Sequence, residues 1–341
     1  MKASATMSPP SAHLAALAGV LACAIGLLLV PVAADAETSP RVARIGFLSL
    51  FPEPTAGHAD PNETAFREGL REGGYEEGHN IVIERRYAGG NGTLLAASAA
   101  ELVRLKVDAI VAGGQPAREA ARKATATIPI VTLSGADPVR EGWATTIARP
   151  GGNVTGLTFT FPELSAKRLE LLKQALPALA RVAVLIDPVE VVDAPDVLRE
   201  TEAGARRLGL TLKVLEIHGP KDLQAAFAPA RRGNAQALVA VAMWPHRTEV
   251  AGLAAGSGLA VMGEESHEAQ AGYLIAYGAD LDDLVRRSAL MTTRILKGAR
   301  AGDLPIERPT KFRLSVNLRT AKALGITIPQ ALLARADEVI E

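Results

Sequence analysis

The stretch from Arg149 to Phe159 constrains the fold of this chain most, because the sequence on its two sides follows one pattern. Pro150 disfavours a helical conformation in the residue before it, and Gly151-Gly152-Asn153 can take the positive φ values of a reversal. Val154 to Phe159 then returns to β-branched and apolar residues, as a strand leaving a loop does. The stretch therefore predicts a loop and a strand that join two similar halves.

Each half repeats the order strand, amphipathic helix, strand. Residues 44–50 before the junction correspond to 181–187 after it, and 107–112 correspond to 236–241. Strands that alternate with helices of this length form parallel βαβ units, and 341 residues exceed what one core usually organises. We therefore expect two α/β lobes joined at residues 149–159.

Three local predictions can be compared directly with a structure. Gly113-Gly114-Gln115-Pro116-Ala117 is expected to link a strand to a helix that runs to about Ala126. Gly272 to Tyr277 predicts a strand, after which Asp280 should cap a long helix that ends at Lys297. The end of the chain, Ala331 to Ile340, is expected to be helical.

The N-terminus has the features of a secretory signal peptide. Leu14 to Ala34 carries no charge, and Ala34-Asp35-Ala36 supplies small residues before a cleavage point at Glu37. A retained membrane anchor is the alternative, and a lipoprotein modified at Cys23 is less consistent with the apolar residues that follow it. Cleavage after Ala36 would leave a mature chain without cysteine, and thus without disulfides or thiol chemistry.

Charge argues against nucleic acid as a partner. The chain has 37 Lys and Arg residues and 37 Asp and Glu residues, and its cations form no long cluster that could make a basic face. Beyond the leader no apolar run approaches the length of a membrane span.

Candidate ligand contacts follow predicted strands. The turn at Gln115, Pro116 and Ala117 would direct backbone N–H groups of a helix N-terminus over the sheet edge, which suits a carboxylate. An ordinary βα turn explains the same residues equally well. Asp137 and Glu264 each follow a strand and could hold a ligand ammonium, whereas a helix cap or a solvated helix start are the simpler interpretations.

Aromatic residues are few, at 4% of the chain, and several fall at or just beyond predicted strand ends. That edge is where doubly wound sheets bind ligands, so the group predicts a partly aromatic cleft, although any one of them could simply close the end of a core. The residues are Phe51, Phe159, Phe161, Trp244 and Tyr277.

Sequence signatures of catalysis are absent. The chain has no dinucleotide or phosphate-loop glycine motif, no G-x-S-x-G and no H-E-x-x-H, and its six histidines are scattered. We expect no catalytic residues, no metal site and no cofactor.

Several short segments between residues 41 and 341 form a recognisable set: 44–48, 66–70, 74–75, 101–104, 137–139, 148–156, 263–265, 294–298 and 335–340. Together they resemble one family, the substrate-binding proteins of ABC transporters with the type I periplasmic-binding fold, which includes tryptophan- and tyrosine-type binders. The loops Phe51-Pro52-Glu53-Pro54 and Met243-Trp244-Pro245-His246 depart from the family pattern.

The resemblance implies two doubly wound parallel-sheet lobes, three crossovers, a hinge, and an interlobe cleft that closes on a small molecule. The signal peptide would be residues 1–36, the N-terminal lobe 41–157 plus about 278–302, and the C-terminal lobe 158–277 plus about 303–341. Loops at the implied cleft contain these candidate ligand residues: Phe51, Gln115, Pro116, Ala117, Ser134, Asp137, Thr158, Phe159, Trp244, Glu264 and Tyr277.

The resemblance implies a periplasmic protein that delivers a small carboxylated or amino-acid-like metabolite to an ABC permease and its ATPase subunits. Its contact with the membrane would then be made only through the permease. A ligand-sensing ectodomain that contacts a receptor is an alternative. A secreted α/β enzyme is a further alternative, which the missing catalytic motifs disfavour.

Overall fold

A computed structural model describes residues 41–50, 53, 61–135, 137–159, 162, 164–188, 191, 194–243 and 246–341. The predicted leader and its cleavage site therefore lie outside the described residues, as do Phe51, Phe161 and Trp244. Within the described ranges the α/β prediction is confirmed, because helices and mainly parallel strands alternate along the chain.

The first sheet is parallel throughout, with strands paired in register from β2 to β5. Its spatial order is β2 (Ile81–Tyr87), β1 (Ala43–Ser49), β3 (Ala109–Gly113), β4 (Ile130–Ser134) and β5 (Val154–Thr158). In β4 and β5 the register pairs Thr132 with Gly156. A Cβ atom on Gly156, whose φ is +151°, would lie 1.9 Å from the carbonyl oxygen of Thr132. Only glycine permits this close approach.

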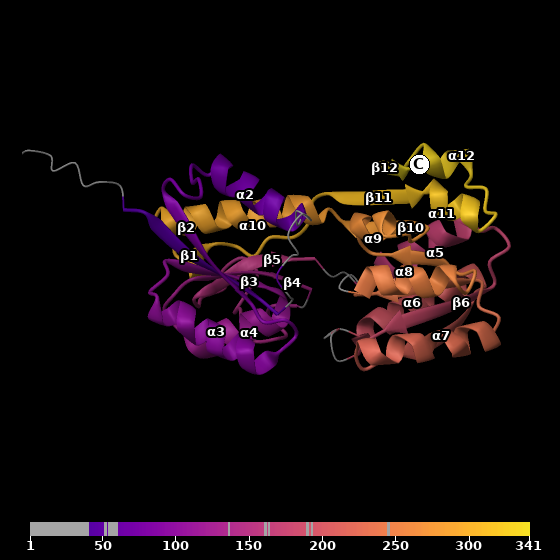
Figure 1. Cartoon of the computed structure of the whole chain (residues 1–341), viewed down its shortest axis with the longest axis horizontal. Helices are drawn as coiled ribbons and strands as arrows, with labels where there is room; N and C mark the ends of the chain where they lie inside the picture. Colours follow the sequence, from indigo (N-terminus) through magenta and orange to yellow (C-terminus); the bar gives the residue numbers. More distant parts are fainter. Residues whose placement is uncertain are drawn as a thin grey trace, which may run out of the picture. The chain divides into compact units, whose positions relative to one another are not determined.

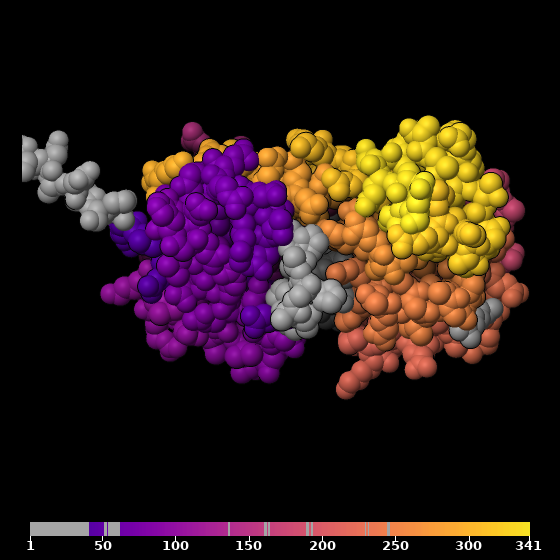
Figure 2. Space-filling view, turned by 45° about the horizontal axis from the view of Figure 1, so that its top comes forward, coloured from indigo at the N-terminus to yellow at the C-terminus, as the bar shows by residue number. Residues whose placement is uncertain are grey.

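In the part of the chain that the structure describes, the helices that accompany this sheet are α2 (Pro61–Glu72), α3 (Gly92–Arg104), α4 (Gly114–Ala124) and α10 (Leu281–Leu296). In Figure 1, α2 and α10 cover one face, and α3 and α4 cover the other. Side chains on these strands point to both faces of the sheet, and both faces are apolar. Ile45 packs in the cluster with α2 and α10, while Leu48 packs in the cluster with α3 and α4. Figure 2 shows orange atoms, which come late in the sequence, next to the indigo and violet atoms of the first sheet and its helices, in agreement with the packing of α10 on α2.

The second sheet is parallel except where β10 meets β11. Its order is β12 (Glu338–Ile340), β11 (Phe312–Asn317), β10 (Ile275–Ala279), β9 (Ala260–Gly263), β8 (Ala237–Val241), β6 (Arg181–Ile186) and β7 (Thr211–Glu216). The helices that pack with it are α5 (Leu164–Ala175), α6 (Ala194–Leu208), α7 (Leu223–Arg232), α8 (Arg247–Ala255), α9 (Ser266–Gln270), α11 (Leu318–Ala323) and α12 (Gln330–Leu333). Short 3₁₀ turns occupy Pro220–Asp222 and Ala301–Asp303.

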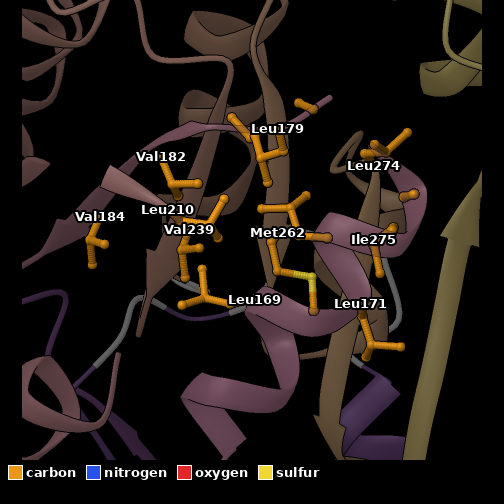
Figure 3. Close-up of a cluster of buried hydrophobic side chains, with 14 of the residues drawn as sticks. Leu169, Leu171, Leu179, Val182, Val184, Leu210, Val239, Met262, Leu274 and Ile275 are labelled. Carbon is orange, nitrogen blue, oxygen red and sulfur yellow. The ribbon is translucent and has the colours of Figure 1, made fainter. Parts of the chain in front are cut away.

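Two hydrophobic clusters cover the faces of this sheet. One contains buried residues of α5 and α6 and the inward side chains of β6, β8 and β9, including Leu169, Val184 and Met262, which Figure 3 shows converging. The other contains residues of α7 and α8, such as Phe227 and Val250. Continuous apolar strands such as Val182 to Ile186 are therefore buried from both sides.

The chain passes between the two groups of elements three times. It leaves the first sheet after Thr158, returns between Ala279 and Leu281, and leaves again between Ile306 and Phe312. Asp280 caps α10 as expected, because its side chain accepts a hydrogen bond from the N–H of Asp283.

Three local expectations need correction. The segment 331–340 is not one helix, because α12 ends at Leu333 and β12 pairs in parallel with β11. Asp337 helps to fix this pairing, since it accepts the N–H of Leu314. The strand predicted at 272–277 is displaced to β10. The connection predicted at Gly113 to Ala117 is mostly helix, because α4 already begins at Gly114, and this helix ends at Ala124 instead of about Ala126.

Candidate functional site

The carboxyl edge of the first sheet contains the start of α4. Gly113 is its N-cap without a side-chain hydrogen bond, and Gly114 has a φ of +82°. In helix geometry the N-cap carbonyl accepts the first intrahelical hydrogen bond, here from Ala117, and Pro116 has no N–H. The N–H groups of Gly114 and Gln115 are therefore the ones that this helix end can direct at an anion.

A buried arginine that sequence reasoning missed lies in the same helix. Arg118 is fully buried and its Nη1 donates to Ser134 Oγ at 2.7 Å. Its Nη2 lies 2.8 Å from a carboxylate oxygen of Glu141, and its guanidinium stands 5.1 Å from the ring centroid of Trp143. Ser134, a predicted ligand residue, is thus fully buried and hydrogen-bonded to Arg118.

The other predicted residues of this edge have mixed surroundings. Thr158 is buried and donates its N–H to the carbonyl of Glu307, while Phe159 is partly buried and donates its N–H to the carbonyl of Ser134. Asp137 is exposed, and its Oδ1 accepts N–H groups of Val139 and Arg140. Residues 138–142 form a turn and not a helix, so Asp137 stabilises a turn instead of the expected helix start, and its contact with a ligand stays a prediction.

The carboxyl edge of the second sheet is organised by an ion pair that the sequence did not predict. Arg168, in α5, lies with its Nη1 2.6 Å from Glu264 Oε1, and its Nε donates to the carbonyl of Tyr277 at 2.9 Å. Glu264 Oε2 accepts the N–H of Ala242 at 2.8 Å. Arg168 lies on the same face of α5 as the buried residues Ser165, Leu171 and Leu172. This helical spacing was the sequence signal that could have predicted its burial.

The residues after Glu264 form an acidic helix start. Glu268 is fully buried, and one of its oxygens accepts the N–H groups of Glu264 at 2.5 Å and Glu265 at 2.9 Å. Burial, followed by the charges of Glu265 and Glu264, raises the pKa of Glu268 to about 8. Burial and the charge of Glu264 also raise the pKa of Glu265 above its ordinary range. The predicted helix start is present, but Glu268 is in the core instead of in solvent.

An aromatic pair lies where β10 and β11 meet. The rings of Tyr277 and Phe312 stack at a centroid distance of 6.4 Å. Phe312 is also part of a polar surface depression of about 580 Å³. Its charged side chains are already paired, for example Arg313 with Asp280 at 3.0 Å. The lining residues are Asp280, Thr310, Lys311, Phe312, Arg313, Asp337 and Glu338.

Within the described ranges, no three His, Cys, Asp or Glu side chains are grouped so that they could hold a metal ion. In the same ranges, every helix is too short or too polar to cross a membrane. The predicted contacts at Phe51 and Trp244 lie outside the described residues.

Comparison with known proteins decides the family. The model of the ABC transporter substrate binding protein family matches residues 59–340. The chain belongs to this family. A tyrosine-binding protein of Clostridioides difficile is 26% identical over 301 residues, which are 84% of this chain and 82% of that protein.

Solved structures agree with the family assignment. A domain from Streptococcus pneumoniae in complex with L-Trp is 24% identical, with a TM-score of 0.78, and the match covers 87% of this chain and 99% of that one. A conserved domain protein from Vibrio cholerae is 26% identical, with a TM-score of 0.78 and coverage of 88% and 100%. A ligand-free, open substrate-binding protein from Clostridium difficile is 25% identical, with a TM-score of 0.66 and coverage of 88% and 99%. The predicted periplasmic-binding fold and family are thereby confirmed.

Proposed function

We propose that this chain is the extracytoplasmic component of an ABC uptake transporter and captures a small carboxylated or amino-acid-like metabolite. The observation that carries the proposal is the family match over residues 59–340, because that family consists of substrate-binding proteins. A permease and its ATPase subunits are the partners that such a protein serves. Export through a signal peptide cleaved after Ala36 is part of the proposal.

The two sheets and their helices are proposed to act as lobes that close on the ligand. The N-terminal lobe would comprise residues 41–157 plus about 278–302, and the C-terminal lobe residues 158–277 plus about 303–341. The three connections after Thr158, after Ala279 and after Ile306 would serve as the hinge. Short connections of this kind absorb the backbone rotations of domain closure.

The ligand carboxylate is proposed to meet the start of α4. Gly113 provides no side-chain cap, so the N–H groups of Gly114 and Gln115 remain for an anion, and the helix dipole favours negative charge there. A ligand ammonium, where present, would meet Asp137 or Glu264, the two carboxylates predicted from the sequence. A charged hydrogen bond of this kind contributes about 1.5–3 kcal/mol.

The apolar part of the ligand is proposed to be aromatic. The relative from Clostridioides difficile carries the name tyrosine-binding protein. In this chain Phe159 directly follows β5, and Tyr277 lies within β10 and stacks on Phe312. Phe51 and Trp244 are proposed contacts on the same grounds of position along the sequence. Offset or edge-to-face packing between rings adds about 0.5–1.5 kcal/mol to the burial of apolar area.

A thermal-shift panel tests the proposed ligand class. We expect L-tyrosine or L-tryptophan to raise the unfolding temperature of the mature chain in proportion to the logarithm of concentration, because a ligand that binds only the folded state stabilises it. Neutral sugars should leave the temperature unchanged. A shift with sugars alone would contradict the proposal. Incubation of the same panel with mass-spectrometric detection of products would expose an enzyme instead.

A further inference from the structure

A single buried guanidinium connects the ends of several segments at the carboxyl edge of the second sheet. Arg168 is 6% exposed and stands in the first turns of α5, just after the chain leaves the first sheet. Its Nε donates to the carbonyl of Tyr277, two residues before the chain returns to the first sheet. Arg168 therefore ties the start of α5, which follows the first connection, to β10, which precedes the second.

The carboxylate partner of Arg168 is occupied on both oxygens. Oε1 of Glu264 lies 2.6 Å from Arg168 Nη1, and Oε2 accepts the N–H of Ala242 at 2.8 Å. Because each oxygen has a different donor on a different segment, the carboxylate is held in one orientation. A ligand ammonium at Glu264 would have to share this carboxylate with a buried guanidinium and a backbone N–H, each of which already holds one of its oxygens.

The hydrogen bond between Ala242 and Glu264 involves a residue with an unusual backbone conformation. Ala242 follows β8 directly and has a φ of +54°, in the left-handed region that residues with a Cβ atom rarely adopt. The hydrogen bond from its N–H to Glu264 stabilises this conformation, which sets the direction in which the chain continues into Met243.

Close backbone packing extends the same arrangement to β10. A Cβ atom on Gly278 would lie 2.0 Å from the carbonyl oxygen of Glu264 and 3.5 Å from Nη2 of Arg168. The ends of β8, β9 and β10 and the start of α5 are thus all in contact with one guanidinium–carboxylate pair.

We infer that Arg168 and Glu264 form a positioning pair for ligand binding, which holds Ala242 after β8, the start of α5 and the end of β10 in the conformation that binds. Glu264 then acts through Ala242 and Arg168, without contacting the ligand, and Asp137 remains as the carboxylate for a ligand ammonium. This inference rests on the proposed function.

The test compares two ligands that differ only in the ammonium group. Calorimetry measures the affinity of L-tyrosine and of 3-(4-hydroxyphenyl)propionate for the parent chain, Glu264→Gln and Arg168→Met. A positioning pair predicts that Glu264→Gln weakens both ligands by the same factor, on the order of tenfold, which equals 1.4 kcal/mol. A direct ammonium contact predicts a loss for L-tyrosine alone, and that result would overturn the inference.

Two variants separate positioning from general damage. Ala242→Gly, added to Glu264→Gln, should recover part of the lost affinity, because glycine takes a φ of +54° without strain. Lys167→Met is the matched control for Arg168→Met, since Lys167 pairs with Glu170 at 3.0 Å in the same helix and is 38% exposed. This control should bind both ligands as the parent chain does.

If the parent chain binds neither ligand, that result contradicts only the proposed ligand class. Amide hydrogen exchange then tests the positioning pair without a ligand. Exchange at Ala242 should then accelerate in both Glu264→Gln and Arg168→Met, because the pair holds its N–H. Unchanged exchange in both variants, or affinities equal to those of the parent, would refute the positioning pair.

Discussion

Gly69→Ala should destabilise the protein, although alanine is the better helix former. Gly69 lies in α2 where this helix packs on α10, more than two hundred residues later in the chain. A Cβ atom there would be 2.3 Å from the carbonyl oxygen of Arg286 and 2.7 Å from the Cβ of Ala289. One turn on, a Cβ on Gly73 would be 2.4 Å from Thr293. Small residues thus set the distance between the two helices.

The size of the effect follows from two opposing contributions. A carbon–oxygen contact needs about 3.3 Å or more, so the helices must move apart by about 1 Å at Arg286. Overpacking of this kind costs about 1–3 kcal/mol, and a clash with backbone belongs at the upper end of that range. Replacing glycine by alanine within a helix returns about 1 kcal/mol. We therefore expect Gly69→Ala to lower the free energy of unfolding by about 1–2 kcal/mol.

Urea unfolding with a matched control measures this difference. Gly252, in α8, is exposed and has no atom within 4 Å of a Cβ built upon it, so Gly252→Ala should gain up to about 1 kcal/mol. The two alanine variants should therefore shift the unfolding midpoint in opposite directions. If Gly69→Ala is as stable as Gly252→Ala, the close packing of α2 on α10 is wrong.

Three further predictions concern protonation, processing and closure. Burial and then the charges of Glu265 and Glu264 raise the pKa of Glu268 from 4.5 to about 8, so its contribution to stability is full below pH 4.5 and is lost as pH rises through 8. Glu268→Gln should flatten this fall in urea titrations from pH 5 to 9, and an unaltered slope would argue against it. Intact-mass measurement of exported protein should give a chain that begins at Glu37, whereas a lipid-modified Cys23 or a retained Met1 would contradict the signal peptide. Small-angle scattering should give a smaller radius of gyration at saturating ligand, and an equal radius would count against lobe closure.

Local sequence signals predicted the parts of the fold that neighbouring residues determine. Pro150 to Asn153 marks the loop before β5, and Asp280 caps α10, because turn and cap chemistry depends on a few adjacent residues. The helix predicted for residues 331–340 was wrong because a distant segment determines the structure there. Glu338–Ile340 becomes a strand because it pairs with Ser315–Asn317, and that tertiary contact overrides the helical spacing.

The candidate site was predictable as a set of strand ends but not as a network. The sequence places Ser134 at the end of β4 and Glu264 just after β9, where the structure has them, whereas Tyr277, expected at a strand end, lies in the middle of β10. It does not indicate that Arg118 binds Ser134 or that Arg168 binds Glu264. Such pairs form between segments far apart in the chain, and only packing decides which charged side chain becomes buried.

A crystal structure of the mature chain with the amino acid selected by calorimetry tests the central claim most directly. The account predicts one ligand whose carboxylate oxygens lie about 3 Å from the backbone nitrogen atoms of Gly114 or Gln115, at the start of α4. It also predicts that Glu264 stays paired with Arg168 and Ala242 in that complex. A ligand bound elsewhere, or a neutral sugar in its place, would contradict the account.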